Sequence, residues 1–138
     1  MGNPLDLGPI RPGERVLDVG CGAGVDAIMA ARLVGGTGRV VGLEFSPDML
    51  AKARANAAKA QAGNLSFVPG SAESLPFPDA SFDVVISNGA YNLVVDKGAA
   101  LAEAFRVLAP GGRLFVADQV LVGPPPQSRE EAVSCWFR

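Results

Sequence analysis

The chain has 138 residues, of which 49% are hydrophobic and 19% charged, with a formal net charge of −2. This length suits one domain with one substantial core, and this composition excludes a disordered chain. The small negative charge gives no general attraction to nucleic acid, so we expect no nucleic-acid partner. Histidine is absent, which excludes an imidazole base, a Ser-His pair and a His-bound metal within this chain.

The two cysteines, Cys21 and Cys135, are too few for a disulfide framework, and their spacing matches no zinc motif. We therefore expect a reducing compartment and no metal site. Residues 1–13 lack the layout of a signal peptide, and no apolar run approaches ~20 residues. These observations predict a cytoplasmic protein that does not enter a membrane.

Short apolar runs alternate with alanine-rich amphipathic segments from end to end. In chain order they predict a strand over 15–19, a helix over 26–34, a strand over 39–45, a helix over 46–61, strands over 65–68 and 82–87, a helix over 97–108 and a strand over 113–120. This alternation predicts an α/β fold, a Rossmann-like open parallel sheet of five strands with helices on both faces.

Local signals place the ends of these helices. Ser46 is expected to cap the second helix with Pro47 in its first turn, and Asp96 is expected to cap the third. The sequence Pro-Gly-Gly at 110–112 is expected to end that third helix. The first helix is expected to turn three apolar side chains toward the core: Ile28, Met29 and Leu33.

The strongest functional signal is the sequence V-L-D-V-G-C-G-A-G at 16–24, between a strand and a helix. Glycines at such a turn allow a ligand to approach the backbone closely. A dinucleotide is one candidate ligand, but the pattern here is G-x-G-x-G and not the pyrophosphate-binding G-x-G-x-x-G. Asp18 would repel a pyrophosphate and attract a cation such as S-adenosylmethionine, which carries a sulfonium and an ammonium group. A purely structural turn is the simpler alternative.

A second signal lies at the end of the second strand. Glu44 follows Gly20 by 24 residues, and a carboxylate in this register can accept both hydroxyls of a ribose. An NAD-type site would use the same acid, and a solvated surface acid is the alternative without function. Phe45 would then lie against an adenine, with core packing as an equal alternative.

Two further segments follow predicted strands. The turn over 70–77 offers backbone that could read an adenine edge, and 87–89 follows the fourth strand. Ligands of open α/β sheets bind at the carboxyl ends of the strands, where all these segments converge. No catalytic residue is predicted. The expected cofactor-binding residues are Asp18, Gly20, Cys21, Gly22, Gly24, Glu44, Phe45, Ser71, Ala72, Glu73, Ser87 and Asn88.

These segments resemble the motifs of class I S-adenosylmethionine-dependent methyltransferases over nearly the whole chain. The matching segments are 17–24, 42–44, 70–77, 82–88 and 106–114. The resemblance implies a sheet ordered 3-2-1-4-5, beyond which a complete member adds an antiparallel pair that we expect to be missing here. It also implies S-adenosylmethionine as the cofactor and in-line transfer of its methyl group to a substrate nucleophile.

Two branches of this superfamily look nearest. Residues 87–97 resemble the arsenite methyltransferases, and residues 73–79 resemble the ubiquinone and menaquinone C-methyltransferases. The arsenite enzymes hold trivalent arsenic with several cysteine thiolates. Cys135 matches one of these, but Ala27 and Gly89 stand where that family carries cysteine. We therefore expect a methyltransferase of an unidentified small molecule. The alternatives are an arsenite methyltransferase, a cofactor-binding but inactive or truncated methyltransferase domain, and a nucleotide-binding oxidoreductase core.

The last segment of the chain differs in character from the rest. We expect the cofactor-binding core to span 1–122, and 123–138 to be a linker and the start of a helix with a capping box at 128–131. Trp136 and Phe137 would need a covering surface, which either missing chain or a second protomer in a homodimer could supply. Tyr91 is interpreted either as a substrate-side acid or base or as a packing residue.

Overall fold

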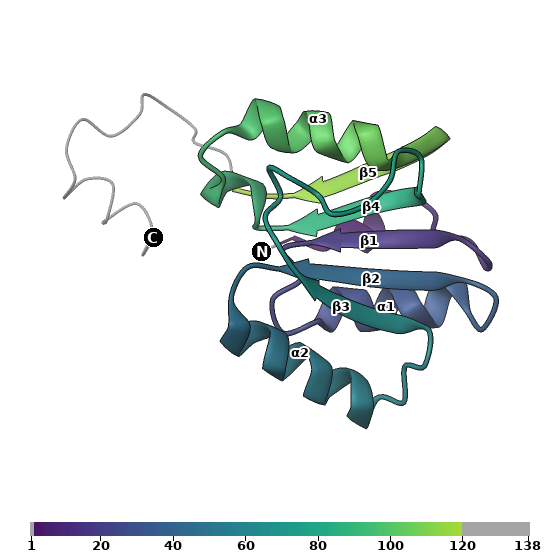
Figure 1. Ribbon diagram of the computed structural model, residues 1–138. Helices are drawn as coiled ribbons and strands as arrows, with labels where there is room; N and C mark the ends of the chain where they lie inside the picture. Colours follow the sequence, from purple (N-terminus) through teal and green to yellow (C-terminus); the bar gives the residue numbers. More distant parts are fainter. Residues whose placement is uncertain (1, 120–138) are drawn as a thin grey trace.

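The computed structural model describes residues 2–119 (Figure 1). Within these residues a five-stranded sheet is accompanied by three α-helices and two short 3-10 turns. In chain order the elements are η1 (Pro4–Asp6), β1 (Arg15–Val19), α1 (Val25–Val34), β2 (Arg39–Glu44), α2 (Pro47–Lys59), β3 (Leu65–Pro69), β4 (Phe82–Asn88), η2 (Tyr91–Leu93), α3 (Lys97–Val107) and β5 (Leu108–Ala117).

The sheet has the order β3-β2-β1-β4-β5, and every pairing between these strands is parallel. In the central strand, Leu17 pairs with Val41 on one side and Val85 on the other. The α/β class, the five strands and the order 3-2-1-4-5 are thus confirmed. The described residues hold no antiparallel strand of this sheet. Because the strands are parallel, the loops after β1, β2, β3 and β4 all emerge at one edge (Figure 1).

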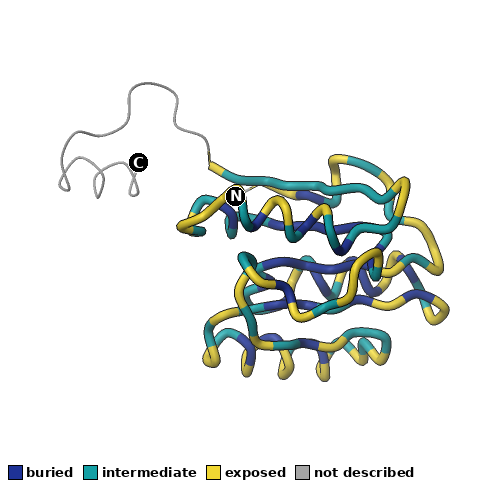
Figure 2. Tube along the Cα trace, turned by 45° about the horizontal axis from the view of Figure 1, so that its top comes forward, coloured by how far each residue is buried: buried dark blue, intermediate teal, exposed yellow. Residues whose placement is uncertain are grey.

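The core has two halves, one on each face of the sheet. Successive residues of a strand point to opposite faces, so Val16 packs with α1 and α2 while Leu17 packs with α3. The fully buried positions are concentrated in the central strands and the helix sides that face them (Figure 2). Helices therefore cover both faces of the sheet, as predicted.

The predicted helix caps are confirmed. Ser46 Oγ accepts a hydrogen bond from the Met49 amide at 3.3 Å, with Pro47 in the first turn of α2. Asp96 Oδ1 accepts one from the Ala99 amide at 3.0 Å at the start of α3. These caps satisfy backbone donors that the first turn of a helix leaves free.

The predicted inner face of α1 is wrong for two of its three residues. Met29 and Leu33 are 44% and 46% exposed, and only Ile28 of the three packs against the core. The buried face carries smaller side chains at helical spacing, namely Ala27, Ala30, Ala31 and Val34. Alanine lets a helix lie close to a sheet, so the small residues face inward and the large ones lie on the surface.

The start of β5 also differs from the prediction. The helix ends at Val107 and the strand begins at once with Leu108, which pairs with Phe82. The next pair is Val84 with Arg113, so residues 109–112 bulge outward opposite a single residue of β4. The Pro-Gly-Gly sequence forms this bulge, for which Gly111 adopts a φ of +77°. The boundary at 122 and the segment 123–138, with Cys135, Trp136 and Phe137, lie outside the described residues.

Within residues 2–119, no helix is both long and apolar enough to cross a membrane.

Candidate functional site

The glycine loop joins β1 to α1 and has left-handed backbone at each of its three glycines. The φ angles are +69° at Gly20, +55° at Gly22 and +87° at Gly24, a region that side chains strongly disfavour. A Cβ on Gly24 would also lie 3.2 Å from the side chains of Ala53 and Phe67. The G-x-G-x-G spacing is therefore required by the backbone path that leads into the first turn of α1.

Glu44 ties this loop to the end of β2. The Gly22 amide donates to Glu44 Oε1 at 3.1 Å, and the Ser46 amide donates to Oε2 at 3.0 Å. The Gly20 and Cys21 amides both donate to the carbonyl of Leu43, at 2.8 and 3.0 Å. Each carboxylate oxygen of Glu44 keeps a free lone pair, so the group is held in place and can still accept hydrogen bonds from a ligand.

Asp18 lies beneath the glycine loop and is only 2% exposed. Its Oδ2 has no hydrogen-bond partner. Burial raises the pKa of this carboxyl well above its usual value, and the nearby carboxylates of Asp26 and Glu44 raise it further, while the Ala27 amide opposes them. A cationic ligand beside these three acids would relieve their mutual repulsion.

Phe45 is 81% exposed. The core-packing interpretation of this residue is therefore wrong, and its ring is free to contact a ligand at the end of β2. An adenine on this ring remains a prediction.

The expected adenine turn lies beside Glu44. The Gly70 amide donates to the carbonyl of Glu44 at 3.2 Å, which fixes the start of the turn. Within the turn, Ser71 Oγ accepts from the Glu73 amide and Ser71 O accepts from the Ser74 amide, both at 3.2 Å. Ala72 lies between these residues and packs partly against the core. The turn is thus a compact loop with a defined shape.

The two residues at the end of β4 occupy different environments. Ser87 is fully buried, and its hydroxyl donates to the carbonyl of Val19 at 3.0 Å, which links β4 to the end of β1. Asn88 Nδ2 donates to Gly2 O at 2.8 Å and to Asp26 Oδ2 at 3.1 Å. Direct contact of either residue with a cofactor remains a prediction.

Cys21 points away from solvent and packs into the core beside Gly42. Burial raises the pKa of its thiol to about 12, with smaller contributions from Asp18 and Glu44. The thiol therefore stays protonated at neutral pH. A protonated, buried thiol is a packing group and not a soft metal ligand.

Four of the five buried polar atoms without a partner among the described residues lie at this same edge. The five atoms are Asp18 Oδ2, Asn88 Oδ1, Tyr91 Oη, Asn92 Oδ1 and Arg113 Nε. The first four belong to residues at the carboxyl ends of β1 and β4 or just beyond. A buried polar atom left unpaired costs about 1–3 kcal/mol, so these four atoms at one edge are available to pair with a polar ligand. The residues present therefore fit a cofactor with polar and cationic groups.

Asn92 is absent from the predicted site residues, and Tyr91 was predicted to be either a substrate-side acid or base or a packing residue. Tyr91 is buried, and burial raises its pKa to about 12. The hydroxyl is therefore neutral at neutral pH, which makes it a hydrogen-bonding group rather than a base. Asn92 carried no signal in the sequence, because nothing there shows that the fold buries its Oδ1 atom.

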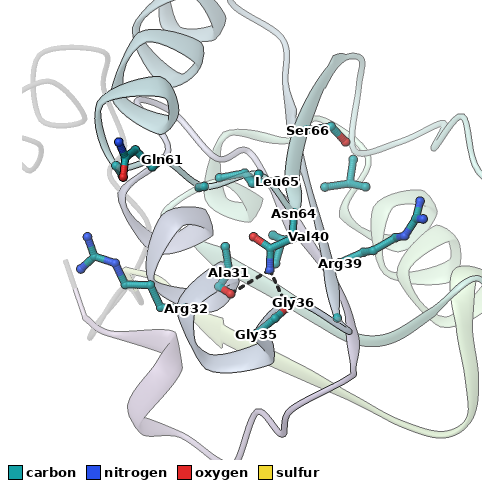
Figure 3. A pocket seen from close by; sticks show the side chains of 15 residues that line it. Ala31, Arg32, Gly35, Gly36, Arg39, Val40, Gln61, Asn64, Leu65 and Ser66 are labelled. Carbon is teal, nitrogen blue, oxygen red and sulfur yellow. Dashed lines mark hydrogen bonds between the residues drawn. The ribbon is translucent and has the colours of Figure 1, made fainter.

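A hollow of about 720 Å³ lies at the opposite edge, beside the amino ends of β2 and β3 (Figure 3). Asn64 extends its amide there and donates to Ala31 O at 2.9 Å and to Gly35 O at 2.8 Å. These bonds satisfy carbonyls at the end of α1. No residue expected to bind the cofactor lines this hollow.

The fold and the carboxyl-edge site define a class of protein, and comparison with known families agrees. Residues 10–137 match the family model described as a methyltransferase domain, and the chain belongs to this family. The matching relatives and solved structures give S-adenosylmethionine as the cofactor. The interpretation as an oxidoreductase core is thereby set aside.

Individual relatives are similar over most of this chain. It is 45% identical over 125 residues to the arsenite methyltransferase of Halobacterium salinarum, covering 91% of this chain and 32% of that protein. It is 43% identical over 122 residues to the ubiquinone/menaquinone biosynthesis C-methyltransferase UbiE of Ectopseudomonas mendocina, covering 88% and 48%. The crystal structure of CrArsM, an arsenic(III) S-adenosylmethionine methyltransferase from Chlamydomonas reinhardtii, superposes with a TM-score of 0.78 at 42% identity, covering 86% and 42%. The chain spans a third to a half of the length of these curated relatives.

Proposed function

We propose that this chain binds S-adenosylmethionine at the carboxyl edge of its sheet and takes part in methyl transfer to a small-molecule acceptor. The observation that carries the proposal is the convergence at one edge of the left-handed glycine loop, the carboxylate of Glu44 and the unpartnered buried oxygen of Asp18. The fold alone would not support it, since related folds serve many functions.

Different residues at this edge would contact different parts of the cofactor. Asp18 and the glycine loop would hold the methionine part, because a carboxylate favours its ammonium and sulfonium charges. Glu44 would accept the ribose hydroxyls, and the turn from Ser71 to Glu73 would contact the adenine. The bound cofactor supplies an already activated methyl group, so alignment of the acceptor can accomplish much of the catalysis.

Arsenite is one candidate acceptor, because two of the relatives described above are named for arsenic methylation. The described residues do not favour it. They contain one cysteine, Cys21, whose raised pKa of about 12 keeps it a thiol, whereas trivalent arsenic is held by thiolates. A quinone precursor, by analogy with UbiE, is the second candidate acceptor.

A calorimetric titration tests the cofactor proposal. The whole chain is titrated with S-adenosylmethionine, S-adenosylhomocysteine and NADH, beside Glu44→Ala and a control, Asp48→Asn. Asp48 is an exposed acid in the first turn of α2, so the control removes the same charge near the site without touching the glycine loop. We expect saturable binding of both S-adenosyl compounds, weakened about tenfold or more by Glu44→Ala and unchanged by Asp48→Asn. Binding of NADH alone, or no binding by folded protein, would overturn the proposal.

Formation of S-adenosylhomocysteine with trivalent arsenic or a demethylated quinone then tests methyl transfer. Product with either acceptor identifies the acceptor class. Cofactor binding without product from either acceptor supports the alternative of a cofactor-binding domain without turnover.

A further inference from the structure

The segment that follows the expected adenine turn is fastened to α3 by one arginine. Arg106 Nη2 donates to Leu75 O at 3.0 Å, and Nη1 donates to Phe77 O at 2.9 Å and Asp79 Oδ1 at 2.8 Å. Its Nε and Nη2 also donate to the carboxylate of Glu103, at 2.8 and 2.9 Å. One guanidinium thus joins the segment 75–79 to the last turns of α3.

Glu103 completes this arrangement from the same helix. Its Oε2 accepts the Leu75 amide at 2.8 Å, so both the amide and the carbonyl of Leu75 are held by the Glu103–Arg106 pair. The Arg106 guanidinium holds the pKa of Glu103 down to about 2, which keeps the carboxylate charged throughout the neutral range. Five donors in a planar fork make such a grip possible for arginine, whereas the single ammonium of lysine cannot reproduce it.

These bonds are not needed to build α3. The helix packs on the sheet through Ala100, Ala104 and Val107, while the side chains of Arg106 and Glu103 remain 32% and 23% exposed. The partners at Leu75, Phe77 and Asp79 are 27 to 31 residues away in the chain. The pair therefore serves the loop more than the helix.

Besides these bonds, a few contacts with other elements hold the segment, among them the bond from the Asp96 amide to Glu73 Oε1 at 3.3 Å and the packing of Leu75 in the core. Gly70 is bonded to Glu44 at the start of the turn, and Ala80 donates to the Arg106 carbonyl at 3.0 Å near the start of β4. Leu75 is the first residue after the turn over 71–74 and is buried. Fixing Leu75 therefore fixes the point at which the turn leaves the cofactor edge.

We propose that Arg106 and Glu103 are positioning residues that set the backbone of the Ser71–Ser74 turn for recognition of the adenine base. The inference rests on the proposed function, which places the adenine at this turn. Backbone groups that recognise adenine must pair with its amino group, which donates, and its ring nitrogen, which accepts. In hypoxanthine the same positions carry a carbonyl oxygen, which accepts, and a ring N–H, which donates. Loosening the turn will therefore reduce discrimination between the two bases, besides weakening binding.

The test compares S-adenosylhomocysteine with S-inosylhomocysteine by titration calorimetry on the whole chain. The variants are Arg106→Lys and a matched control, Arg15→Lys. Arg15 makes a similar set of bonds to Asp83 at the opposite edge, through its amide at 2.8 Å, Nε at 3.2 Å and Nη2 at 3.0 Å. Both substitutions keep the positive charge and remove several guanidinium hydrogen bonds, but only Arg106→Lys removes bonds to the segment that follows the turn.

We expect the original protein to prefer the adenosyl compound and Arg106→Lys to lose about tenfold in affinity for it. The inosyl compound should lose less, so that the ratio of the two dissociation constants moves toward one. Arg15→Lys should lower the thermal unfolding temperature and leave this ratio unchanged. An unchanged ratio in Arg106→Lys, or the same change in Arg15→Lys, would overturn the inference.

If Arg106→Lys does not fold, Glu103→Gln provides the same comparison, because it removes the charge that holds the Leu75 amide and leaves the bonds from Arg106 to the loop carbonyls. Failure of the original protein to bind S-adenosylhomocysteine would instead contradict the proposed function, and this inference with it. The two failures are therefore distinguishable.

Discussion

Gly20 and Ala90 are in direct contact across the cofactor edge: a Cβ added to Gly20 would overlap the methyl group of Ala90. Gly20 belongs to the loop after β1, and Ala90 to the loop after β4. The two strands are neighbours in the sheet, so their loops emerge side by side and pack backbone against side chain. The first glycine of the G-x-G-x-G pattern is therefore required for a second reason besides its left-handed φ of +69°.

Gly20→Ala is expected to destabilise the protein by about 2 kcal/mol or more, because the added methyl meets Ala90 and the backbone conformation is unfavourable for alanine. Urea unfolding followed by circular dichroism measures this change. Gly63→Ala is the control, since Gly63 is exposed, lacks a positive φ and has nothing within 4 Å of an added Cβ. It should change the free energy of unfolding by less than about 0.5 kcal/mol. Equal effects of the two substitutions would contradict this account.

Phe45→Ala is expected to separate binding from stability. The ring is 81% exposed without ligand, so its removal should change stability by less than about 0.5 kcal/mol. If the ring lies against the adenine, the affinity for S-adenosylhomocysteine should fall about three- to tenfold. Phe105→Ala removes another exposed ring, on α3, and should leave the affinity unchanged. An unaltered affinity in Phe45→Ala would show that the ring plays no part in binding.

Cys21 is expected to resist alkylation in the folded protein. Its thiol is buried and its pKa is raised to about 12, so little thiolate is present at pH 8. We expect the peptide that contains Cys21 to react with iodoacetamide about a hundredfold more slowly in native protein than in guanidinium. Peptide mass spectrometry follows this one cysteine separately from Cys135. Rapid labelling in native protein would instead restore Cys21 as a candidate ligand for a soft acceptor.

Much of the fold was predictable because its signals are local. Caps such as Ser46 and Asp96 act within three residues, and the glycine cluster marks the loop after β1 by its own conformational demand. Strand–helix alternation then leaves few parallel topologies. The prediction for α1 was wrong because periodicity alone does not show which face turns inward. The alanine face packs on the sheet, whereas the larger Met29 and Leu33 lie on the surface.

The network that supports the site could not be predicted, because its contacts depend on tertiary structure. Arg106 meets Leu75 only after β4 and α3 have brought them together, and the sequence separation of 31 carries no pattern. The bulge at 109–112 was missed for a related reason, since a Pro-Gly-Gly sequence suits both a helix end and a bulge. The pairing of Leu108 and Arg113 with residues of β4 determines that this sequence forms a bulge.

Asp18→Asn is expected to raise stability while lowering affinity for the cofactor. The folded-state pKa of Asp18 lies well above its unfolded value because the carboxyl is buried beside Asp26 and Glu44. The folded protein therefore holds a proton on Asp18 that the unfolded chain releases. The stabilising contribution of Asp18 is complete below about pH 4, and it is lost as the pH rises through the folded-state pKa. At pH 7 the asparagine variant, which folds without taking up a proton, should be more stable by roughly 0.5–2 kcal/mol.

Urea unfolding between pH 4 and pH 8 measures this difference, which should shrink toward the acid end of the range. Asp83→Asn is the control of opposite sign, since the Arg15 guanidinium holds the pKa of Asp83 below its usual value. That carboxylate stabilises the fold above its unfolded pKa and ceases to do so as the pH falls through the folded value, so its removal should destabilise the protein at pH 7. A stabilised Asp18→Asn that still binds S-adenosylmethionine with full affinity would show that the buried carboxyl serves no ligand. Stabilisation together with a loss of affinity would instead show that this acid is retained for binding at the expense of stability.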